Sequence, residues 1–337
     1  MIITSLLDTD LYKFTMMQAV LHRFPAAGVR YAFRCRTPGI DLRPVAERVR
    51  AEIHHLCSLR LNPAELDYLR SLRYIKEDFI QFLRLFRFNE AFVNLDTAGG
   101  EFTLTIEGPW LHTILFEVPV LAIVSEAWSR HHRPQPDFDP GEARLARKIE
   151  RVKEAAGRGL DFRFCDFGTR RRFTRRWQSR VVSTLKDELP ECFVGTSNVR
   201  LAMDLDLTPI GTMAHEWLMA AQELGPRLAD SQRFALDHWV HEYRGDLGIA
   251  LSDTVGFDAF LRDFDMYFAK LFDGCRHDSG DPVEWGERLI RHYRELGIDP
   301  STKTAIFSDG LEIANALELA RHFAGRIRTS FGIGTSL

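Results

Sequence analysis

Most of the residues in this sequence that could do chemistry lie in seven short polar segments, each of which follows a run of β-prone residues. These segments are residues 167–170, 195–198, 211–215, 252–254, 276–280, 308–310 and 332–335. A single Gly-Thr or Asp-Gly pair is usually an ordinary turn. Seven segments in phase with the same strand pattern instead indicate a set of strand ends that could form one site.

The residue types in these segments favour a phosphorylated sugar as the ligand. Arg170 and Arg276 could each bind a phosphate through two hydrogen bonds. Asp253, Asp278 and Asp309 could accept hydrogen bonds from sugar hydroxyls or hold Mg²⁺, and backbone N–H groups of the Gly-Thr turns could bind phosphate. None of the seven lysines lies at the carboxyl end of a predicted strand, which argues against a Schiff-base aldolase.

His215 is the histidine that is best placed for a function. It follows a Gly-Thr turn at the predicted start of a helix, where backbone N–H groups could stabilise an added phosphoryl group. The alternative is a structural histidine, which is the more common role for a lone histidine. The arginine-rich run at residues 170–180 is predicted to be a solvated face, with a nucleic-acid-binding stripe as the alternative.

The elements that must position these residues alternate between short strands and helical segments. The polar segments follow one another at intervals of roughly 16 to 41 residues, a spacing that suits a strand plus a crossover helix. The pattern therefore predicts a parallel sheet, and the number of units favours its closure into a barrel. Function is then expected at the carboxyl ends of the strands.

The first 130 residues predict a separate α/β domain, with the barrel domain at residues 131–337. A helix is expected after Thr9 or Asp10, with an apolar face made by Leu11, Phe14, Met17, Leu21 and Phe24. Tyr12 lies nearly opposite that face and is not expected in the core. Further along the chain, the expected elements are strands at residues 29–36 and 101–107 and helices at 45–87 and 112–133.

The composition describes a folded chain and excludes some classes of protein. The 337 residues are 45% hydrophobic and 27% charged, with a net charge of −3, which is unlike a dedicated nucleic-acid binder. The most apolar stretch, residues 114–128, is predicted to be buried core that is too short to cross a membrane. The first residues lack the pattern of a secretory signal, and five scattered cysteines favour neither disulfides nor a zinc site. A cytoplasmic location is expected.

The motifs together resemble those of the nicotinate phosphoribosyltransferases, the type II phosphoribosyltransferases of NAD salvage. The resemblance rests on residues 9–12, 166–171, 195–198, 211–216, 278–281, 307–310 and 331–335, in this order. It implies an irregular (β/α) barrel with an N-terminal α/β sandwich domain. It also implies a homodimer with shared active sites.

The resemblance further implies a reaction and its cofactors. Nicotinate and phosphoribosyl pyrophosphate would give nicotinate mononucleotide and pyrophosphate, with Mg²⁺ and coupled ATP hydrolysis. No direct protein ligand of the Mg²⁺ is implied. Two alternatives stay open, namely a truncated, non-catalytic phosphosugar-binding barrel and a nicotinamide-specific relative.

The resemblance assigns roles to matching residues. Tyr12 of the neighbouring subunit and Phe167 would enclose the pyridine ring, and Thr212 would lie on the nicotinate side. Nicotinamide-using relatives carry an acidic residue at the position of Ser197, and the alternative role of Ser197 is to cap the following helix. Arg276 would contact nicotinate and the phosphoribosyl donor, and Arg170 would contact the donor's phosphates. Asp278, Asp309 and Gly310 would contact the ribose and its Mg²⁺-bound pyrophosphate, and Gly334 and Thr335 the 5′-phosphate. ATP would phosphorylate His215.

One feature differs from the family pattern. Members continue beyond the Gly-Ile-Gly-Thr turn, usually with an Asn-Asp pair, whereas this sequence stops at Leu337. The chain is therefore expected to lack the C-terminal tail that completes the barrel region in the family.

Overall fold

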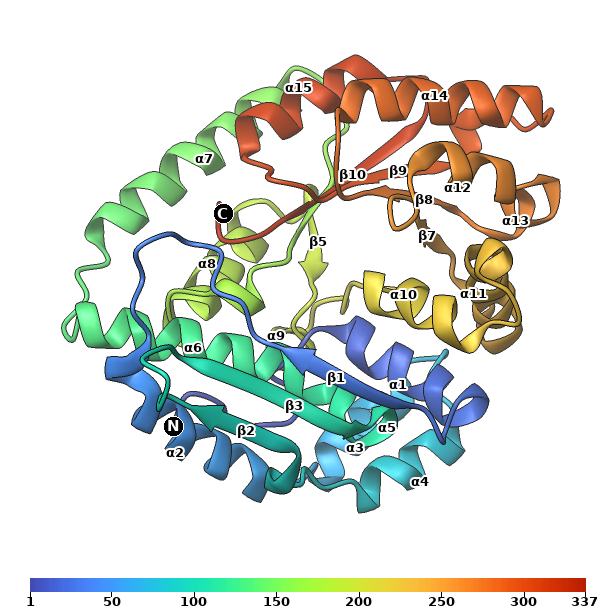
Figure 1. Cartoon of the computed structure of the whole chain (residues 1–337). Helices are drawn as coiled ribbons and strands as arrows, with labels where there is room; N and C mark the ends of the chain where they lie inside the picture. Colours follow the sequence, from blue (N-terminus) through green and yellow to red (C-terminus); the bar gives the residue numbers. More distant parts are fainter.

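The computed structural model describes residues 1–337 and contains two β-sheets surrounded by helices (Figure 1). An antiparallel sheet has the order β1-β3-β2 and a parallel sheet has the order β5-β4-β10-β9-β8-β7. The strands are β1 (Gly28–Ala32), β2 (Val93–Asp96), β3 (Thr103–Pro109), β4 (Phe164–Asp166), β5 (Phe193–Thr196), β6 (Arg244–Leu247), β7 (Ile249–Leu251), β8 (Gly274–His277), β9 (Thr304–Phe307) and β10 (Arg328–Ile333). The expected α/β class with a parallel sheet is confirmed.

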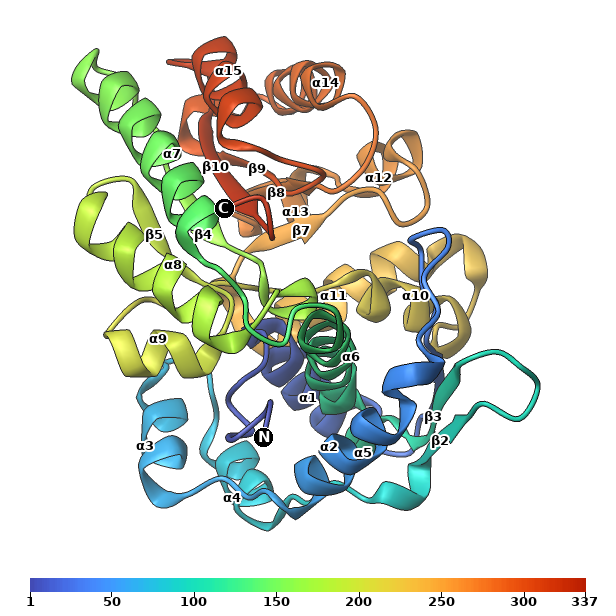
Figure 2. The ribbon, with the colours of Figure 1, turned by 90° about the vertical axis from the view of Figure 1, so that its left-hand side faces the viewer.

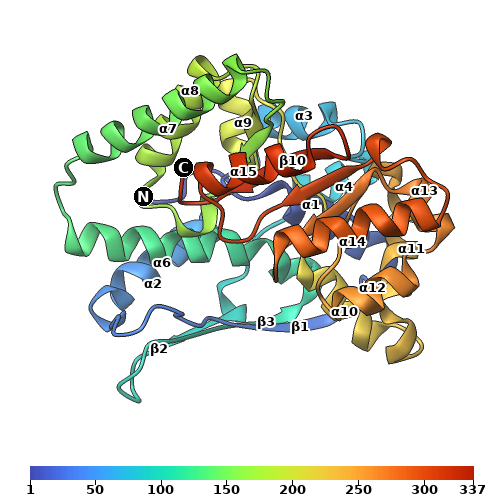
Figure 3. The ribbon, with the colours of Figure 1, turned by 90° about the horizontal axis from the view of Figure 1, so that it is seen from above.

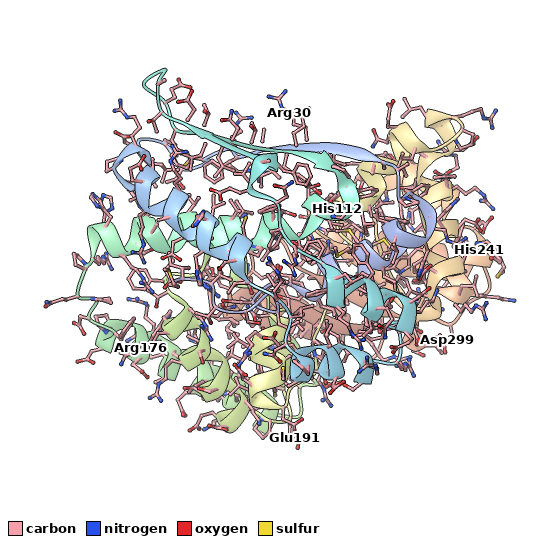
Figure 4. The ribbon with its side chains drawn as sticks, turned by 90° about the horizontal axis from the view of Figure 1, so that it is seen from below. Arg30, His112, Arg176, Glu191, His241 and Asp299 are labelled. Carbon is pink, nitrogen blue, oxygen red and sulfur yellow. The ribbon has the colours of Figure 1, made fainter.

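Fifteen α-helices connect and cover these strands. They are α1 (Leu11–Arg23), α2 (Ala46–Ser58), α3 (Pro63–Ser71), α4 (Glu77–Leu85), α5 (Trp110–Thr113), α6 (Glu117–His132), α7 (Asp139–Gly157), α8 (Arg175–Glu188), α9 (Val199–Leu205), α10 (His215–Leu224), α11 (Ser231–Tyr243), α12 (Phe257–Asp263), α13 (Met266–Leu271), α14 (Pro282–Glu295) and α15 (Ile313–Phe323). Helices α14 and α15 lie over the strands β8 to β10 (Figures 1 and 3). The antiparallel sheet lies at the opposite side, where Arg30 of β1 points outward (Figure 4). All strands of the first sheet precede residue 130, and the division into two domains there stays a prediction.

The parallel sheet has six strands where the sequence predicted seven. The run before Gly211 forms only a bridge between Pro209 and Thr196, because proline has no N–H with which to extend a ladder. This segment nevertheless packs closely on β5, since a Cβ at Gly195 would lie 2.1 Å from the carbonyl oxygen of Thr208. The Thr212 hydroxyl then donates to the carbonyl of Ile249 in β7 at 3.1 Å. The segment thus links the two edges of the sheet.

Helix α1 is buried on every side. The predicted core residues Leu11, Phe14 and Met17 are fully buried, but Tyr12 is buried too, with only 8% of its surface exposed. The expectation that Tyr12 lies outside the core is therefore wrong for the single chain. The helix lies between the N-terminal helices and α10 and α11 of the barrel (Figures 1 and 2), so its polar face contacts protein as well.

The helical segment Trp110–His132 matches the helix expected at residues 112–133 and extends beyond the apolar stretch 114–128 at both ends. Its length and hydropathy would suffice to cross a membrane, but 78% of its most apolar window is buried inside the protein. The segment packs against α2 and beside α1 (Figure 2). The role of residues 114–128 as buried core is confirmed, although the helical segment that contains them is long enough to span a bilayer.

A buried ion pair fastens the first residues to the barrel. Asp8 accepts hydrogen bonds from Arg172 at 2.7 and 2.9 Å and from Asn198 at 2.8 Å. Burial by itself would raise the pKa of Asp8, but the charge and hydrogen bonds of Arg172 reverse this and lower it. The segment before α1 is thereby held against the ends of β4 and β5.

Replacing Asp8 with asparagine should lower the free energy of unfolding by about 3 to 5 kcal/mol, because the buried Arg172 would lose its closest charged partner and keep only Glu126, whose Oε2 lies 3.4 Å from its Nε. The folded-state pKa of Asp8 lies below the unfolded one, so its contribution is present above about pH 4 and is lost as the pH falls through the folded pKa. Urea unfolding at pH 7 and at lower pH measures both effects. Asp41→Asn, in an exposed pair with Arg43, is the control. Equal loss of stability on acidification in wild type and Asp8→Asn would contradict this assignment.

Candidate active site

The predicted site residues gather where the parallel strands end. The carboxyl ends of parallel strands meet at one edge of a sheet, and the loops that follow β4, β7, β8, β9 and β10 carry Arg170, Asp253, Asp278, Asp309 and Gly334, respectively. Asp309, Gly310 and Thr335 are exposed there, while Asp278 and Gly334 are partly buried. The sheet therefore brings together residues that lie up to 165 positions apart.

His215 is the first residue of α10 and lies between two aspartates. Its Nε2 is 3.1 Å from Oδ1 of Asp253, and its Nδ1 is 3.7 Å from Oδ2 of Asp278. Ser279 donates to the other oxygen of Asp253 at 2.7 Å. Burial acts to raise the pKa of Asp253, but the hydrogen bonds from His215 and Ser279 lower it overall. Asp253 is therefore ionised at neutral pH and orients the imidazole, 38% of which is exposed.

The hydroxyl of Ser308 supports Asp278 from the neighbouring strand. Ser308 follows β9, and its Oγ contacts both the carboxylate of Asp278 and, at 3.1 Å, the carbonyl of His277. The aspartate beside His215 is thus held by a contact between β8 and β9.

Two arginines supply positive charge at this edge. Arg170 has 44% of its side chain exposed, and its Nη1 lies 3.8 Å from Oε1 of Glu117. The proximity of Tyr12, Asp10 and Glu117 raises the pKa of Arg170 further above its ordinary value. Arg276 is partly buried on β8, and its guanidinium has no ion pair or hydrogen bond within the chain. Arg276 is accordingly a cation without a protein counter-ion, which suits an anionic ligand.

Ser197 is engaged by a carboxylate from another element. Its Oγ donates to Oδ1 of Asp10 at 2.7 Å, and both residues are buried. Burial raises the pKa of Asp10, although Arg170 and Ser197 act against this. Ser197 does not cap the following helix, since Asn198 does so by accepting from the N–H of Leu201. The turn at residues 195–197 contains no acidic residue, but the tertiary structure places the carboxylate of Asp10 beside it.

Phe167 packs against the turn that is predicted to bind phosphate. A Cβ at Gly332 would lie 2.3 Å from the ring of Phe167, so this position requires glycine. The N–H of Phe167 also donates to the carbonyl of Ile333 at 2.7 Å. The loops after β4 and β10 therefore form one unit.

The residues that sequence reasoning missed form a buried ionic cluster below the site. Lys13 is completely buried and pairs with Glu117 and Glu216. Burial would lower the pKa of Lys13, but the two carboxylates raise it overall, so the ammonium is charged. No local signal marks these residues, because Lys13 and Glu216 are 203 positions apart.

The arginine-rich run is neither a uniformly solvated face nor a uniform basic stripe. Arg170 lies at the site and Arg172 is buried against Asp8. Arg171, Arg176 and Arg180 are exposed. The fold gives neighbouring arginines different exposure and different partners, which a charge count cannot distinguish.

Protein side chains alone do not form a metal site, as no group of three or more His, Cys, Asp or Glu residues is arranged to hold a metal ion. Mg²⁺ commonly uses one or two carboxylates together with substrate phosphates and water. Asp278 and Asp309 at the strand ends fit that mode, in which the donor's diphosphate would provide the other ligands.

A parallel α/β barrel with arginines, aspartates and a flanked histidine at its strand ends suits an enzyme that binds a phosphorylated sugar. Residues 7–125 match the model of the nicotinate phosphoribosyltransferase N-terminal domain, and residues 162–337 match that of the nicotinate phosphoribosyltransferase family. The chain belongs to the nicotinate phosphoribosyltransferase family, which is an enzyme family of NAD salvage.

Similar proteins support this assignment over the whole chain. Nicotinate phosphoribosyltransferases of Bordetella pertussis and Burkholderia mallei are 60% and 58% identical to it; the matches cover 100% of this chain and 84% and 85% of those proteins. The crystal structure of nicotinate phosphoribosyltransferase from Vibrio cholerae superposes with a TM-score of 0.96 at 44% identity, covering 100% of this chain and 80% of that one. The expected family and the nicotinate phosphoribosyltransferase function are confirmed, whereas coupled ATP hydrolysis stays a prediction.

Proposed function

We propose that the chain transfers the phosphoribosyl group of phosphoribosyl pyrophosphate to nicotinate, releasing pyrophosphate, and that ATP hydrolysis is coupled to this step. The observation that carries the proposal is the placement of His215 between Asp253 and Asp278 at the edge that also bears Arg170. An aspartate-oriented histidine at a helix N-terminus is suited to accept a phosphoryl group.

The donor would bind across the ends of β4, β8, β9 and β10. Loss of pyrophosphate from C1 of the ribose develops positive charge on the sugar and negative charge on the leaving group. Arg276 and Arg170 would stabilise the leaving group, and Asp278 and Asp309 would bind ribose hydroxyls or Mg²⁺. Bound Mg²⁺ would neutralise pyrophosphate charge. Gly310 closes the β9 loop, and the turn at residues 332–335, including Gly334 and Thr335, would bind the 5′-phosphate through backbone N–H groups.

Nicotinate would bind beside the ends of β4 and β5. Phe167 would contact one face of the ring and Tyr12 the other. Ser197 and Thr212 would line its carboxylate side, although in the free chain their hydroxyls donate to Asp10 and to Ile249. Binding would therefore exchange these hydrogen bonds for bonds to the ligand, while Arg276 would supply the opposite charge.

ATP would transfer its γ-phosphoryl group to a ring nitrogen of His215, releasing ADP, and water would later release phosphate. The added group carries close to two negative charges. Such a charge at the strand ends can reorganise Arg170 and Arg276, so that ATP cleavage changes the affinity for the donor.

The working unit would be a homodimer in which Tyr12 of one subunit completes the site of the other. Within one chain, Tyr12 lies beside Lys13, whose ammonium is 5.6 Å from the ring centroid, and near Arg170, whose pKa it raises. The alternative is therefore that Tyr12 serves the site of its own chain. We also place the enzyme in the cytosol, since its five cysteines are all free thiols.

Pyrophosphate release with nicotinate or nicotinamide, donor, Mg²⁺ and ATP tests this function. The expected kcat/KM for nicotinate exceeds that for nicotinamide by about a hundredfold or more, because a few kcal/mol of electrostatic preference suffices for this ratio. Ser197→Asp should abolish the preference by adding a carboxylate beside Asp10. Thermal unfolding of the variant checks that it is folded.

The outcomes separate the alternatives. No turnover of either base would indicate a non-catalytic phosphosugar-binding barrel, and equal turnover of both bases would reject the assigned substrate. An unchanged preference in folded Ser197→Asp would reject only the role of Ser197.

A further inference from the structure

Four alternating charges connect the candidate donor site to the helix that carries His215. Arg170 lies 3.8 Å from Glu117, Glu117 pairs with Lys13, and Lys13 pairs with Glu216. Glu216 directly follows His215 in α10. The four side chains come from the β4 loop and from α6, α1 and α10, so tertiary packing alone aligns them.

The two carboxylates among these four charges have different numbers of hydrogen-bond donors. Glu216 also accepts hydrogen bonds from the hydroxyl of Tyr31 and the indole N–H of Trp110. Glu117 has no other protein donor besides Lys13 and the distant Arg170, and 27% of its side chain is exposed. Glu117 is therefore the carboxylate whose partner could change.

We propose that Lys13 is a positioning residue that holds Glu117 in a tight ion pair and so keeps Arg170 available for the phosphates of the donor. This inference rests on the proposed function. Without Lys13, Glu117 would be a partly buried carboxylate whose nearest cation is Arg170, and the two would form a close pair. The donor would then have to compete with Glu117 for the same guanidinium.

The arrangement also explains why a lysine is buried in a helix core. A charged residue that is completely buried needs compensating charges, and an apolar side chain of similar length would fill the same space. Methionine at position 13 would satisfy packing, but it would not neutralise Glu117. The lysine is thus required for charge and not for volume.

A charge-rescue experiment tests the proposal. Lys13→Met should raise the KM for phosphoribosyl pyrophosphate, and its dissociation constant in calorimetry, by about tenfold to a hundredfold, the range of a charge-assisted hydrogen bond. The KM for nicotinate should change little. Lys13→Met/Glu117→Gln should recover most of the donor affinity, because the competing carboxylate is gone. Lys76→Met, which removes a lysine that pairs with the buried Glu242 of α11, should leave donor affinity unchanged.

Each outcome decides the question. A donor affinity that is unchanged in folded Lys13→Met, or that falls equally in the single and double variants, would overturn the positioning role. Wild type that binds the donor without turning over nicotinate would instead contradict the proposed function. The calorimetric measurement of donor binding keeps these two failures distinct.

Discussion

Arg276→Ala should lower kcat/KM for nucleotide formation by about a hundredfold to a thousandfold, with the loss mainly in kcat. Arg276 has no counter-ion in the chain, so it is free to stabilise charge that develops on the leaving pyrophosphate. Removing one such preorganised donor typically costs about 3 to 4 kcal/mol of transition-state stabilisation. Steady-state kinetics with saturating nicotinate measures the change. Arg291→Ala, which alters an exposed arginine of α14, is the matched control.

The same variant tests whether two subunits share a site. Arg276→Ala and Tyr12→Ala are each expected to be inactive, but a mixed dimer would contain one site with both side chains intact. Random exchange of subunits should then restore about a quarter of wild-type activity. A mixture that stays inactive after confirmed exchange would show that Tyr12 acts within its own chain. Full activity of Arg276→Ala would reject the role given to this arginine.

His215→Ala should abolish the dependence on ATP while leaving slow, ATP-independent synthesis. The alanine cannot accept a phosphoryl group, but the residues assigned to nicotinate and donor stay in place. In wild type, ATP is expected to increase donor affinity by about 5- to 150-fold, the usual range of coupling between two ligands. The variant should have nearly the same donor KM with and without ATP, a ratio close to one. Donor KM with and without ATP gives this ratio directly.

Transfer of label from γ-labelled ATP provides a second measurement of the same prediction. Wild type should incorporate acid-labile phosphate and His215→Ala should not. His241→Ala is the control, because His241 lies on the outer surface on α11 (Figure 4). Equal labelling of wild type and His215→Ala would exclude His215 as the acceptor.

Local patterns in the sequence were sufficient to predict several features of this protein. The apolar runs of the parallel strands and the polar residues after them predicted the class of the fold and the edge of the sheet at which the site lies. Strand runs that are buried on both faces are apolar throughout, so they can be recognised without their partners. The motif order also identified the family. The strand predicted before Gly211 failed because Pro209 interrupts the ladder.

The tertiary structure alone decided which charges meet. Asp10 reaches Ser197 across 187 positions, and Lys13 reaches Glu216 across 203. It also buried Tyr12, which the helical period had placed away from the core, because α1 is packed between two sets of helices. Helical period reports one face of one element, whereas burial and ion pairing depend on what packs against every face. That information is contained in contacts between distant segments and not in the spacing of residues along the chain.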